Sequence, residues 1–157
     1  MRIGHSKDVH KLVENRPLIL GGKQIDHHHG LLGHSDADVL VHVVIESIIG
    51  ALGLGDIGTH FPDTDPVYKG VNSMDLLAAT KVMLDESNYQ ICNLDATIYA
   101  EAPKMRPHID DMRQNVAKAL DINTSQVNIK ATRGEGMGFI GRCEGMGAEC
   151  VVLLQEK

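Results

Sequence analysis

The chain has 157 residues, of which 43% are hydrophobic and 23% are charged, and its formal net charge is −6. This length predicts one domain, residues 1–157, with a hydrophobic core, and the ordinary composition excludes the disordered and low-complexity classes. The acidic balance and the lack of a lysine or arginine stripe argue against nucleic acid as a partner.

The first part of the chain predicts two short strands followed by a polar loop. Residues Met1–Gly4 and Pro17–Leu20 form the strands, and the second strand ends at a Gly21-Gly22 turn. Residues 24–33 are rich in histidine and glycine, and we expect them to form a loop. Three adjacent histidines in it, His27, His28 and His29, resemble a metal site, but adjacent side chains point in different directions, which favours a mobile loop.

Three helices are predicted after this loop. Ser35 is a preferred N-cap for the first, with Asp38 three residues later and apolar residues at helical spacing up to Gly53 and Gly55. Residues 55–66 have turn chemistry throughout. Ser73 caps the second helix, which runs to about residue 87, and Pro107 lies in the first turn of the third, which ends near residue 120.

Three later strands complete the prediction, at residues 91–100, 127–131 and 149–154. A glycine-rich connection with some helical potential, residues 134–147, precedes the last. We therefore expect an α+β two-layer sandwich, with a mixed sheet of four to five strands and three helices on one face. Val151 and Leu153 on the uncovered face are predicted to pack against another copy of the chain.

The cysteine pattern and the N-terminus indicate the compartment. The three cysteines, Cys92, Cys143 and Cys150, form no CxxC pair, which is typical of reduced intracellular thiols. The N-terminal sequence MRIGHSKDVH lacks the apolar run of a signal peptide, and no segment is apolar enough to span a membrane. We expect a cytoplasmic protein with no membrane partner. A plastid location after loss of a transit peptide is the less favoured alternative.

Asp8 and His10 are the first candidate metal ligands. They are two residues apart, so both side chains point to the same face of an extended segment, and His42 on the first helix could reach that face. One carboxylate and two imidazoles would leave zinc an open fourth position, as in catalytic sites. Asp38 and Glu46 share a helical stripe with His42, so either could accept its second N–H and fix its tautomer. A surface histidine with a capping aspartate is the competing interpretation.

Two further segments have the chemistry to bind anions. His34 and Ser35 precede the first helix and could cradle a phosphate, although a plain N-cap beside a surface histidine fits them equally. In the second segment, Lys130, Thr132 and Arg133 suit a polyanion, and Glu135 offers a hard oxygen for Mg²⁺. It is not a Walker A sequence, because no GKS or GKT follows the glycines. Residues 100–105 form another strand-to-turn junction with an available backbone and a lysine.

Taken together, five segments resemble the 2-C-methyl-D-erythritol 2,4-cyclodiphosphate synthase family over residues 2–154. They are RIGHSKDVH, GLLGHSDADVLVH, GDIGTHFPDTDP, AEAPKMRPHI and KATRGEGMGFIGR. The resemblance implies a metal-dependent lyase of non-mevalonate isoprenoid biosynthesis. Its reaction cyclises 4-diphosphocytidyl-2-C-methyl-D-erythritol 2-phosphate by intramolecular phosphoryl transfer and releases CMP. It also implies a homotrimer with active sites between neighbouring chains.

The resemblance also implies a set of site residues. Zn²⁺, or another divalent transition metal, is expected at Asp8, His10 and His42, and Mg²⁺ or Mn²⁺ at Glu135 with the substrate phosphates. Catalytic roles are expected for His34 and Arg133. The implied phosphate and erythritol contacts are Asp8, His10, His34, Ser35, Asp56, Ile57, Gly58, Phe61, Pro62, Asp63, Thr64 and Asp65. The implied cytidine contacts are Ala100, Glu101, Ala102, Pro103, Lys104, Met105, Arg106, Ala131, Thr132 and Arg133, and Phe139 and Arg142 match residues near a central channel.

The chain departs from the family pattern at three places. The family usually has two threonines where this chain has Thr132-Arg133, and we expect Arg133 to replace the second hydroxyl with a bidentate phosphate contact. Lys7 stands where the family commonly has an aromatic or small residue, and the histidine triplet falls on a mobile flap. Two alternatives stay open: a zinc-dependent phosphoesterase that yields an open-chain product, and a non-catalytic trimer that binds a nucleotide or an isoprenoid diphosphate.

Overall fold

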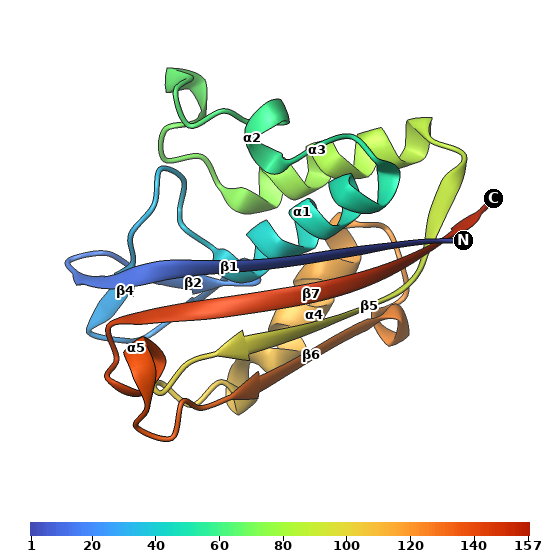
Figure 1. Cartoon of the computed structure of the whole chain (residues 1–157). Coiled ribbons are helices and arrows are strands. Elements are labelled where there is room, and N and C mark those ends of the chain that lie inside the picture. The colour runs from blue at the N-terminus through green and yellow to red at the C-terminus, as the bar shows by residue number, and fades with distance from the viewer.

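A computed structural model describes residues 1–157 and contains one five-stranded mixed sheet (Figure 1). The strand order is β4-β1-β7-β5-β6, and every neighbouring pair is antiparallel except the parallel pair β5 and β6. A separate hairpin pairs β2 with β3. The strands are β1 (Arg2–Glu14), β2 (Leu18–Leu20), β3 (Lys23–Ile25), β4 (His29–Leu31), β5 (Tyr89–Tyr99), β6 (Val127–Thr132) and β7 (Gly145–Glu156).

Strand β1 is much longer than the four residues predicted for it. It pairs with β7 from Arg2 opposite Leu154 to Lys11 opposite Gly145. Its even-numbered residues from Gly4 to Leu12 face the helices, and its odd-numbered residues from Ile3 to Lys11 face the open side of the sheet. The expected loop at residues 24–33 was also wrong in part, because it contains the end of β3 and all of β4.

Helices cover one face of this sheet. Helix α1 packs on β1 and β7, and α4 packs on β6, whereas α3 lies over α1 and α4 (Figure 1). This arrangement confirms the α+β class and a mixed sheet of five strands. The helices are α1 (Val39–Leu52), α2 (Ile57–His60), α3 (Ser73–Glu86), α4 (Ile109–Ala119) and α5 (Gly138–Gly141), with 3₁₀ turns at Pro66–Tyr68, Arg106–His108 and Thr124–Gln126. No helix is long and apolar enough to cross a bilayer.

Both predicted N-caps were wrong, by three residues for α1 and by one residue for α3. The cap of α1 is Asp38, whose side chain accepts from the Val41 N–H, and not Ser35. The cap of α3 is Asn72, which accepts from the Met74 N–H, and Ser73 is the first helical residue. Both serines are therefore free for other contacts, and both turn toward the same histidine.

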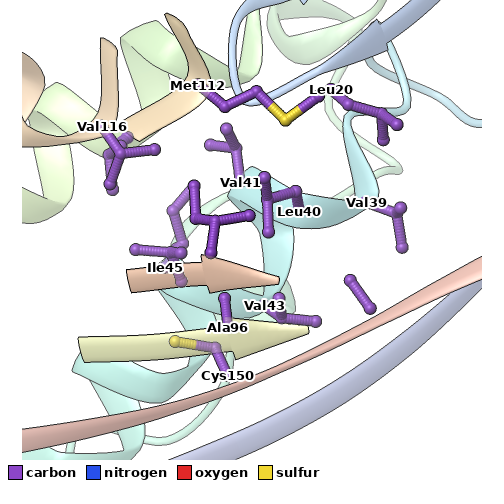
Figure 2. Packing of buried hydrophobic residues seen from close by; sticks show 14 of the residues in the cluster. Leu20, Val39, Leu40, Val41, Val43, Ile45, Ala96, Met112, Val116 and Cys150 are labelled. Atoms are coloured by element: carbon purple, nitrogen blue, oxygen red, sulfur yellow. The ribbon is translucent and has the colours of Figure 1, made fainter. Parts of the chain in front are cut away.

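The core is aliphatic and lies between α1 and the sheet (Figure 2). Helix α1 is buried on nearly all sides because it lies between the sheet and α3. A Cβ on Gly4 of β1 would lie 1.8 Å from the Ser47 carbonyl oxygen, so glycine lets the strand approach the helix closely. The Ser47 hydroxyl donates to the carbonyls of Val43 and Cys150, the second of which lies on β7. These contacts fix α1 relative to β1.

The opposite face of the sheet has no covering layer. Ile3 is 70% exposed, Val9 50% and Val151 44%, although all three lie on the two central strands β1 and β7. The three cysteines are free, but the expectation that most of them are buried was wrong, because only Cys150 is buried and Cys143 is exposed.

Candidate functional site

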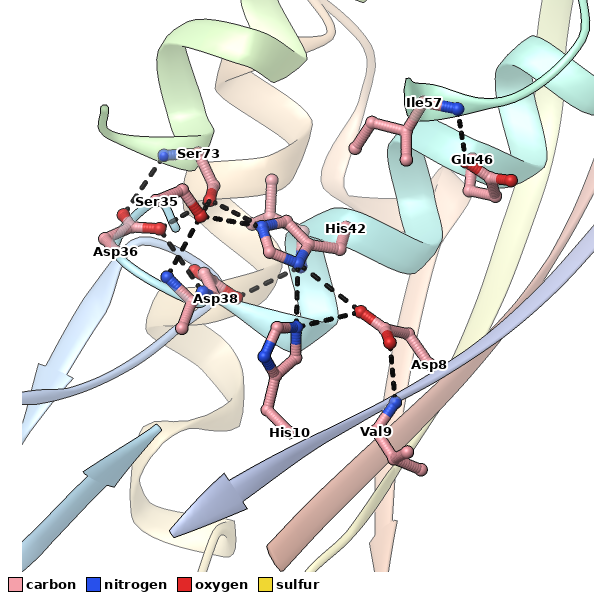
Figure 3. A network of polar contacts seen from close by, with 12 residues as sticks. Asp8, Val9, His10, Ser35, Asp36, Asp38, His42, Glu46, Ile57 and Ser73 are labelled. Carbon is pink, nitrogen blue, oxygen red and sulfur yellow. Dashed lines mark hydrogen bonds and ion pairs between the residues drawn. The ribbon is translucent and has the colours of Figure 1, made fainter. Parts of the chain in front are cut away.

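Strand β1 and the first turns of α1 bring Asp8, His10 and His42 together (Figure 3). The Nε2 atom of His10 lies 3.0 Å from Asp8 Oδ2 and 3.2 Å from His42 Nδ1, and that Nδ1 lies 3.4 Å from Asp8 Oδ2. The three ligand atoms all lie within 4.8 Å of one another. This is the triad predicted from the sequence, and it converges as a set of metal ligands does.

The second ring nitrogen of His10 is held by the backbone. Its Nδ1 lies 2.7 Å from the Leu32 carbonyl oxygen, which can only accept. In the neutral imidazole the proton therefore sits on Nδ1, and the lone pair on Nε2 points at the centre of the triad. Leu32 directly follows β4, so the pairing of β4 with β1 positions this carbonyl.

The tautomer of His42 follows from a chain of hydrogen bonds through Ser73 to Asp36. The Ser73 hydroxyl donates to Asp36 Oδ1 at 2.5 Å, because a carboxylate can only accept. Ser73 Oγ lies 3.0 Å from His42 Nε2 and is therefore left to accept its N–H. The Nδ1 lone pair of His42 is then directed toward Asp8 and His10. Ser35 Oγ also lies 3.0 Å from Nε2 and strengthens this arrangement.

The predicted orienting carboxylates of His42 were wrong. Asp38 is fully buried and accepts from the backbone N–H groups of Gly21, Gly22 and Val41. Burial raises its pKa to about 6, against the opposing effect of these hydrogen bonds. Glu46 accepts from the Ile57 N–H at 2.6 Å and so holds the start of α2. No sequence signal pointed to Asp36 and Ser73, because 37 positions separate them.

The triad carries a localised negative charge beside a basic imidazole. Burial opposes ionisation of Asp8, but its contacts with the His10 and His42 rings, together with the hydrogen bond from the Val9 N–H, outweigh it and hold the Asp8 pKa well below its usual value. For His10, burial lowers the pKa, yet the contacts with Asp8 and the Leu32 carbonyl raise it overall. A metal ion at this centre would compete with protons for His10 Nε2, His42 Nδ1 and the Asp8 carboxylate.

A cavity of about 470 Å³ opens beside the triad, between β1, α1 and α2. It brings together the predicted phosphate-binding residues His34, Ser35, Ile57, Gly58, Phe61 and Asp63. Its lining also contains six residues that were not predicted to bind: Ser6, Lys7, Glu46, Tyr68, Val71 and Leu76.

Four predicted contacts do not line this cavity. Asp56 accepts from the Thr59 N–H at 2.8 Å, and Asp65 accepts from the Val67 N–H at 3.0 Å, so both cap turns in the surrounding loop. Pro62 and Thr64 lie in the same loop.

A second cavity, of about 1090 Å³, lies where β5 and β6 end. It contains every residue of the predicted cytidine set, together with Glu135 and Lys130. Phe139 and Arg142 line neither cavity; Arg142 instead pairs with Glu144 through two hydrogen bonds, at 2.8 and 3.1 Å.

Arg133 is engaged by a neighbour within this second cavity. Its Nη2 and Nε donate to Glu101 Oε1 at 2.5 and 3.2 Å, and Glu101 Oε2 accepts from the Gly134 N–H at 2.9 Å. The predicted bidentate fork is thus directed at a carboxylate in this structure. Hydrogen bonding to Glu101 raises the pKa of Arg133, so the guanidinium stays charged.

The two cavities are far apart within one chain. The first lies on β1, whereas the second lies on β5 and β6, and β7 separates β1 from β5. Two to three strand spacings, roughly 10 to 14 Å, therefore divide the strand of the metal triad from the strands of the second cavity.

Comparison with known proteins adds family information to this geometry. The model of the YgbB family matches residues 1–155. A 2-C-methyl-D-erythritol 2,4-cyclodiphosphate synthase of Clostridium perfringens is 58% identical over 98% of this chain and 99% of its own length. The bifunctional IspDF of Campylobacter jejuni matches 99% of this chain with 43% identity and a TM-score of 0.95, and this chain spans 42% of that protein. The Plasmodium falciparum IspF complex with CDP matches 99% of this chain and 96% of its own, with 34% identity and a TM-score of 0.87.

Proposed function

The chain belongs to the YgbB family of 2-C-methyl-D-erythritol 2,4-cyclodiphosphate synthases, and we propose that it carries out their reaction at the Asp8, His10 and His42 centre. The activity is the cyclisation of 4-diphosphocytidyl-2-C-methyl-D-erythritol 2-phosphate in isoprenoid biosynthesis. The 2-phosphate oxygen attacks the β-phosphorus of the same molecule, a P–O bond forms, and the bond to CMP breaks. The observation that carries the proposal is the convergence of three metal ligands beside a cavity able to hold phosphates.

The donor set fits a divalent transition metal. Two neutral imidazole nitrogens and one carboxylate oxygen are ligands that zinc accepts, and they leave a coordination position for substrate. Both imidazoles already present lone pairs to the centre, because Leu32 and Ser73 hold the opposite nitrogens. We propose zinc as the resident ion; when bound, it supplies a Lewis acid for a phosphate oxygen.

The work of this chain's own residues is to position two phosphates. His34 and Ser35 face the first cavity beside the triad. The Lys7 side chain turns to the opposite face of the sheet, where its ammonium lies over the Tyr99 ring. Arg16 holds the backbone of this segment by donating to the carbonyls of Gly33 and Ser35, at 3.3 and 2.9 Å. No side-chain nucleophile is required, since both reacting groups belong to one substrate. Catalysis then depends on orientation and charge neutralisation.

The second cavity is proposed to hold the cytidine and the α-phosphate. It joins two segments that are far apart in sequence, residues 100–106 and 131–133, through the parallel pairing of β5 and β6. Lys130 and Glu135 stand at the same cavity, and we propose that Glu135 holds Mg²⁺ or Mn²⁺ with the substrate phosphates. The match to an IspF complex with CDP supports a cytidine ligand here.

Assembly into a homotrimer is proposed to complete the site. One substrate must reach both cavities, yet β7 stands between β1 and β5, the strands that carry them in a single chain. A neighbouring copy could bring its second cavity to the metal triad, and the exposed apolar residues Ile3, Val9 and Val151 offer a face for that contact. Residues 1–157 would then act as one synthase domain that functions only in the assembly.

The proposal is tested by ³¹P NMR of the protein with its cytidyl substrate, Zn²⁺ and Mg²⁺. We expect a cyclic diphosphate signal to grow together with CMP, and His42→Ala to abolish both. An open-chain phosphate product would instead show the zinc-dependent phosphoesterase. Binding of CDP without turnover under any metal condition would show a non-catalytic homologue, which the intact triad argues against.

A further inference from the structure

A second cluster of imidazoles lies outside both cavities, at the connection between β3 and β4. The ring centroid of His27 is 6.1 Å from that of His28 and 6.2 Å from that of His29, with interplanar angles of 48° and 51°. In a regular strand, adjacent side chains would point to opposite faces. Here Asp26–His28 lies between the strands β3 and β4, and its irregular backbone brings His27 near both neighbours.

The metal triad provides a scale for these separations. The rings of His10 and His42, which converge on one centre, have centroids 5.2 Å apart with an interplanar angle of 55°. Imidazole nitrogens bind zinc at about 2.0–2.1 Å, which places two rings on a tetrahedral ion with centroids roughly 5 Å apart. The centroid distances from His27 to His28 and His29 are thus about one ångström longer than the distance between His10 and His42. Rotation about side-chain bonds can close this difference.

Both ends of the cluster are anchored to the fold. Ile25 and Gly30 are buried on either side of it, and a Cβ on Gly30 would lie 2.2 Å from the Pro17 carbonyl oxygen. His29 begins β4 and stands opposite Glu14 of β1. The segment is therefore a short span between fixed points, and it holds the His27 ring near those of His28 and His29 before any ligand arrives.

The local charges also suit a cation. Asp26 precedes the histidines, and Glu14 faces His29 across the strand pair. Residues 26–32 contain no lysine or arginine that would repel a metal ion.

We propose that His27, His28 and His29 form a second transition-metal site, separate from the Asp8, His10 and His42 centre. Its ligands are imidazoles on a partly exposed loop, so it takes transition-metal ions that favour nitrogen donors. We expect Cu²⁺ to bind more tightly than Ni²⁺ or Zn²⁺, and Mg²⁺ not to bind. Water fills the remaining positions. Strand β4 runs directly from this site to Leu32, which orients His10, so the two sites share one structural element.

The experiment is equilibrium dialysis of untagged protein against Ni²⁺ and, separately, Zn²⁺, with bound metal counted by mass spectrometry. Four proteins are compared: the wild type, H27Q/H28Q/H29Q, H10A/H42A, and the two sets combined. Glutamine keeps the polarity and approximate size of histidine, and a circular dichroism melt of each variant verifies the fold. The readout is metal stoichiometry, so it is independent of whether the chain turns over any substrate.

We expect two metal equivalents per chain in the wild type, one in each of the two separate sets, and none in the combined protein. Wild-type saturation at one equivalent would overturn the proposal, as would an unchanged stoichiometry in folded H27Q/H28Q/H29Q. If the combined protein still bound one equivalent, that second ion would belong to other side chains, and the assignment to this loop would also be wrong.

Discussion

At the scale of single residues, the site depends on which nitrogen of each histidine carries the proton. His10 presents Nε2 and His42 presents Nδ1, because a backbone carbonyl and a serine hydroxyl hold the opposite atoms. The hydroxyl of Ser73 is itself fixed by Asp36. Such outer partners keep a metal ligand in one tautomer and one orientation, and their loss commonly weakens metal binding.

Ser73→Ala should therefore weaken zinc affinity by about 10- to 100-fold, because the N–H of His42 would lose its acceptor and the ring would be less well oriented. Affinity is measured by competition with a chromophoric chelator. Ser87→Ala is the matched control, since Ser87 caps the other end of the same helix, where its hydroxyl donates to the Leu84 carbonyl and accepts from the Tyr89 N–H, away from the triad. Equal zinc affinity in folded Ser73→Ala and wild type would show that Asp36 and Ser73 do not orient the ligand.

Arg133 presents a second question at this scale, since its guanidinium now pairs with Glu101. In the proposed function it must contact the diphosphate while Glu101 anchors its position. Arg133→Thr should then lower kcat/KM for the cytidyl substrate roughly tenfold, the effect of losing a charge-assisted hydrogen bond. Lys118→Thr removes the same charge from an exposed helix position and should have no such effect. Unchanged kcat/KM in Arg133→Thr would mean that the side chain only binds Glu101.

The sequence predicted the three ligands of the triad but not the residues that orient them. The spacing of Asp8 and His10 is visible in one segment because extended backbone brings alternate side chains to one face. The partners of His42 come from a turn and from the start of a distant helix, and their contacts depend on how α3 packs on α1. Local patterns carry no information about that packing.

At the scale of elements, the helices were easier to predict than the strand that carries the site. The apolar spacing of α1 is strong because this helix is buried between two layers. Strand β1 lacks a clear alternation because the residues on its inner face include Ser6, Asp8 and His10, which line the cavity in place of a hydrophobic core. The functional residues themselves obscured the strand, so only its first three residues, Arg2 to Gly4, were predicted.

The approach of β1 to α1 gives a stability prediction for this element pair. Gly4→Ala should destabilise the protein by about 3 kcal/mol, because the new Cβ would lie 1.8 Å from the backbone oxygen of Ser47. Gly50→Ala, in α1, is the control: the new Cβ meets no atom within 4 Å, and the change should stabilise the protein by about 1 kcal/mol through helix propensity. Urea unfolding measures both values. If Gly4→Ala were as stable as the wild type, the close packing of β1 on α1 would be contradicted.

At the scale of the whole molecule, the strand order separates what the reaction must join. All of the expected cytidine contacts line one cavity, and eight of the twelve expected phosphate and erythritol contacts line the other. The sequence could not predict that β7 would lie between the strands that carry the two cavities, because strand order depends on long-range pairing. The proposed assembly would bring a neighbouring copy onto the sheet face that carries the exposed residues Ile3, Val9 and Val151.

The most direct measurement of the central claim is a complementation assay, with formation of the cyclic diphosphate as its readout. One variant, His42→Ala, lacks the metal centre, and the other, Ala131→Trp, has an indole filling the second cavity. Each alone should be inactive. After the two are unfolded and refolded together in equal amounts, a site shared between neighbouring chains predicts about a quarter of wild-type activity, because random assembly pairs an intact metal centre with an intact second cavity in that fraction of sites. No recovery of activity, from a mixture in which size-exclusion chromatography shows mixed assemblies, would contradict a shared cyclisation site.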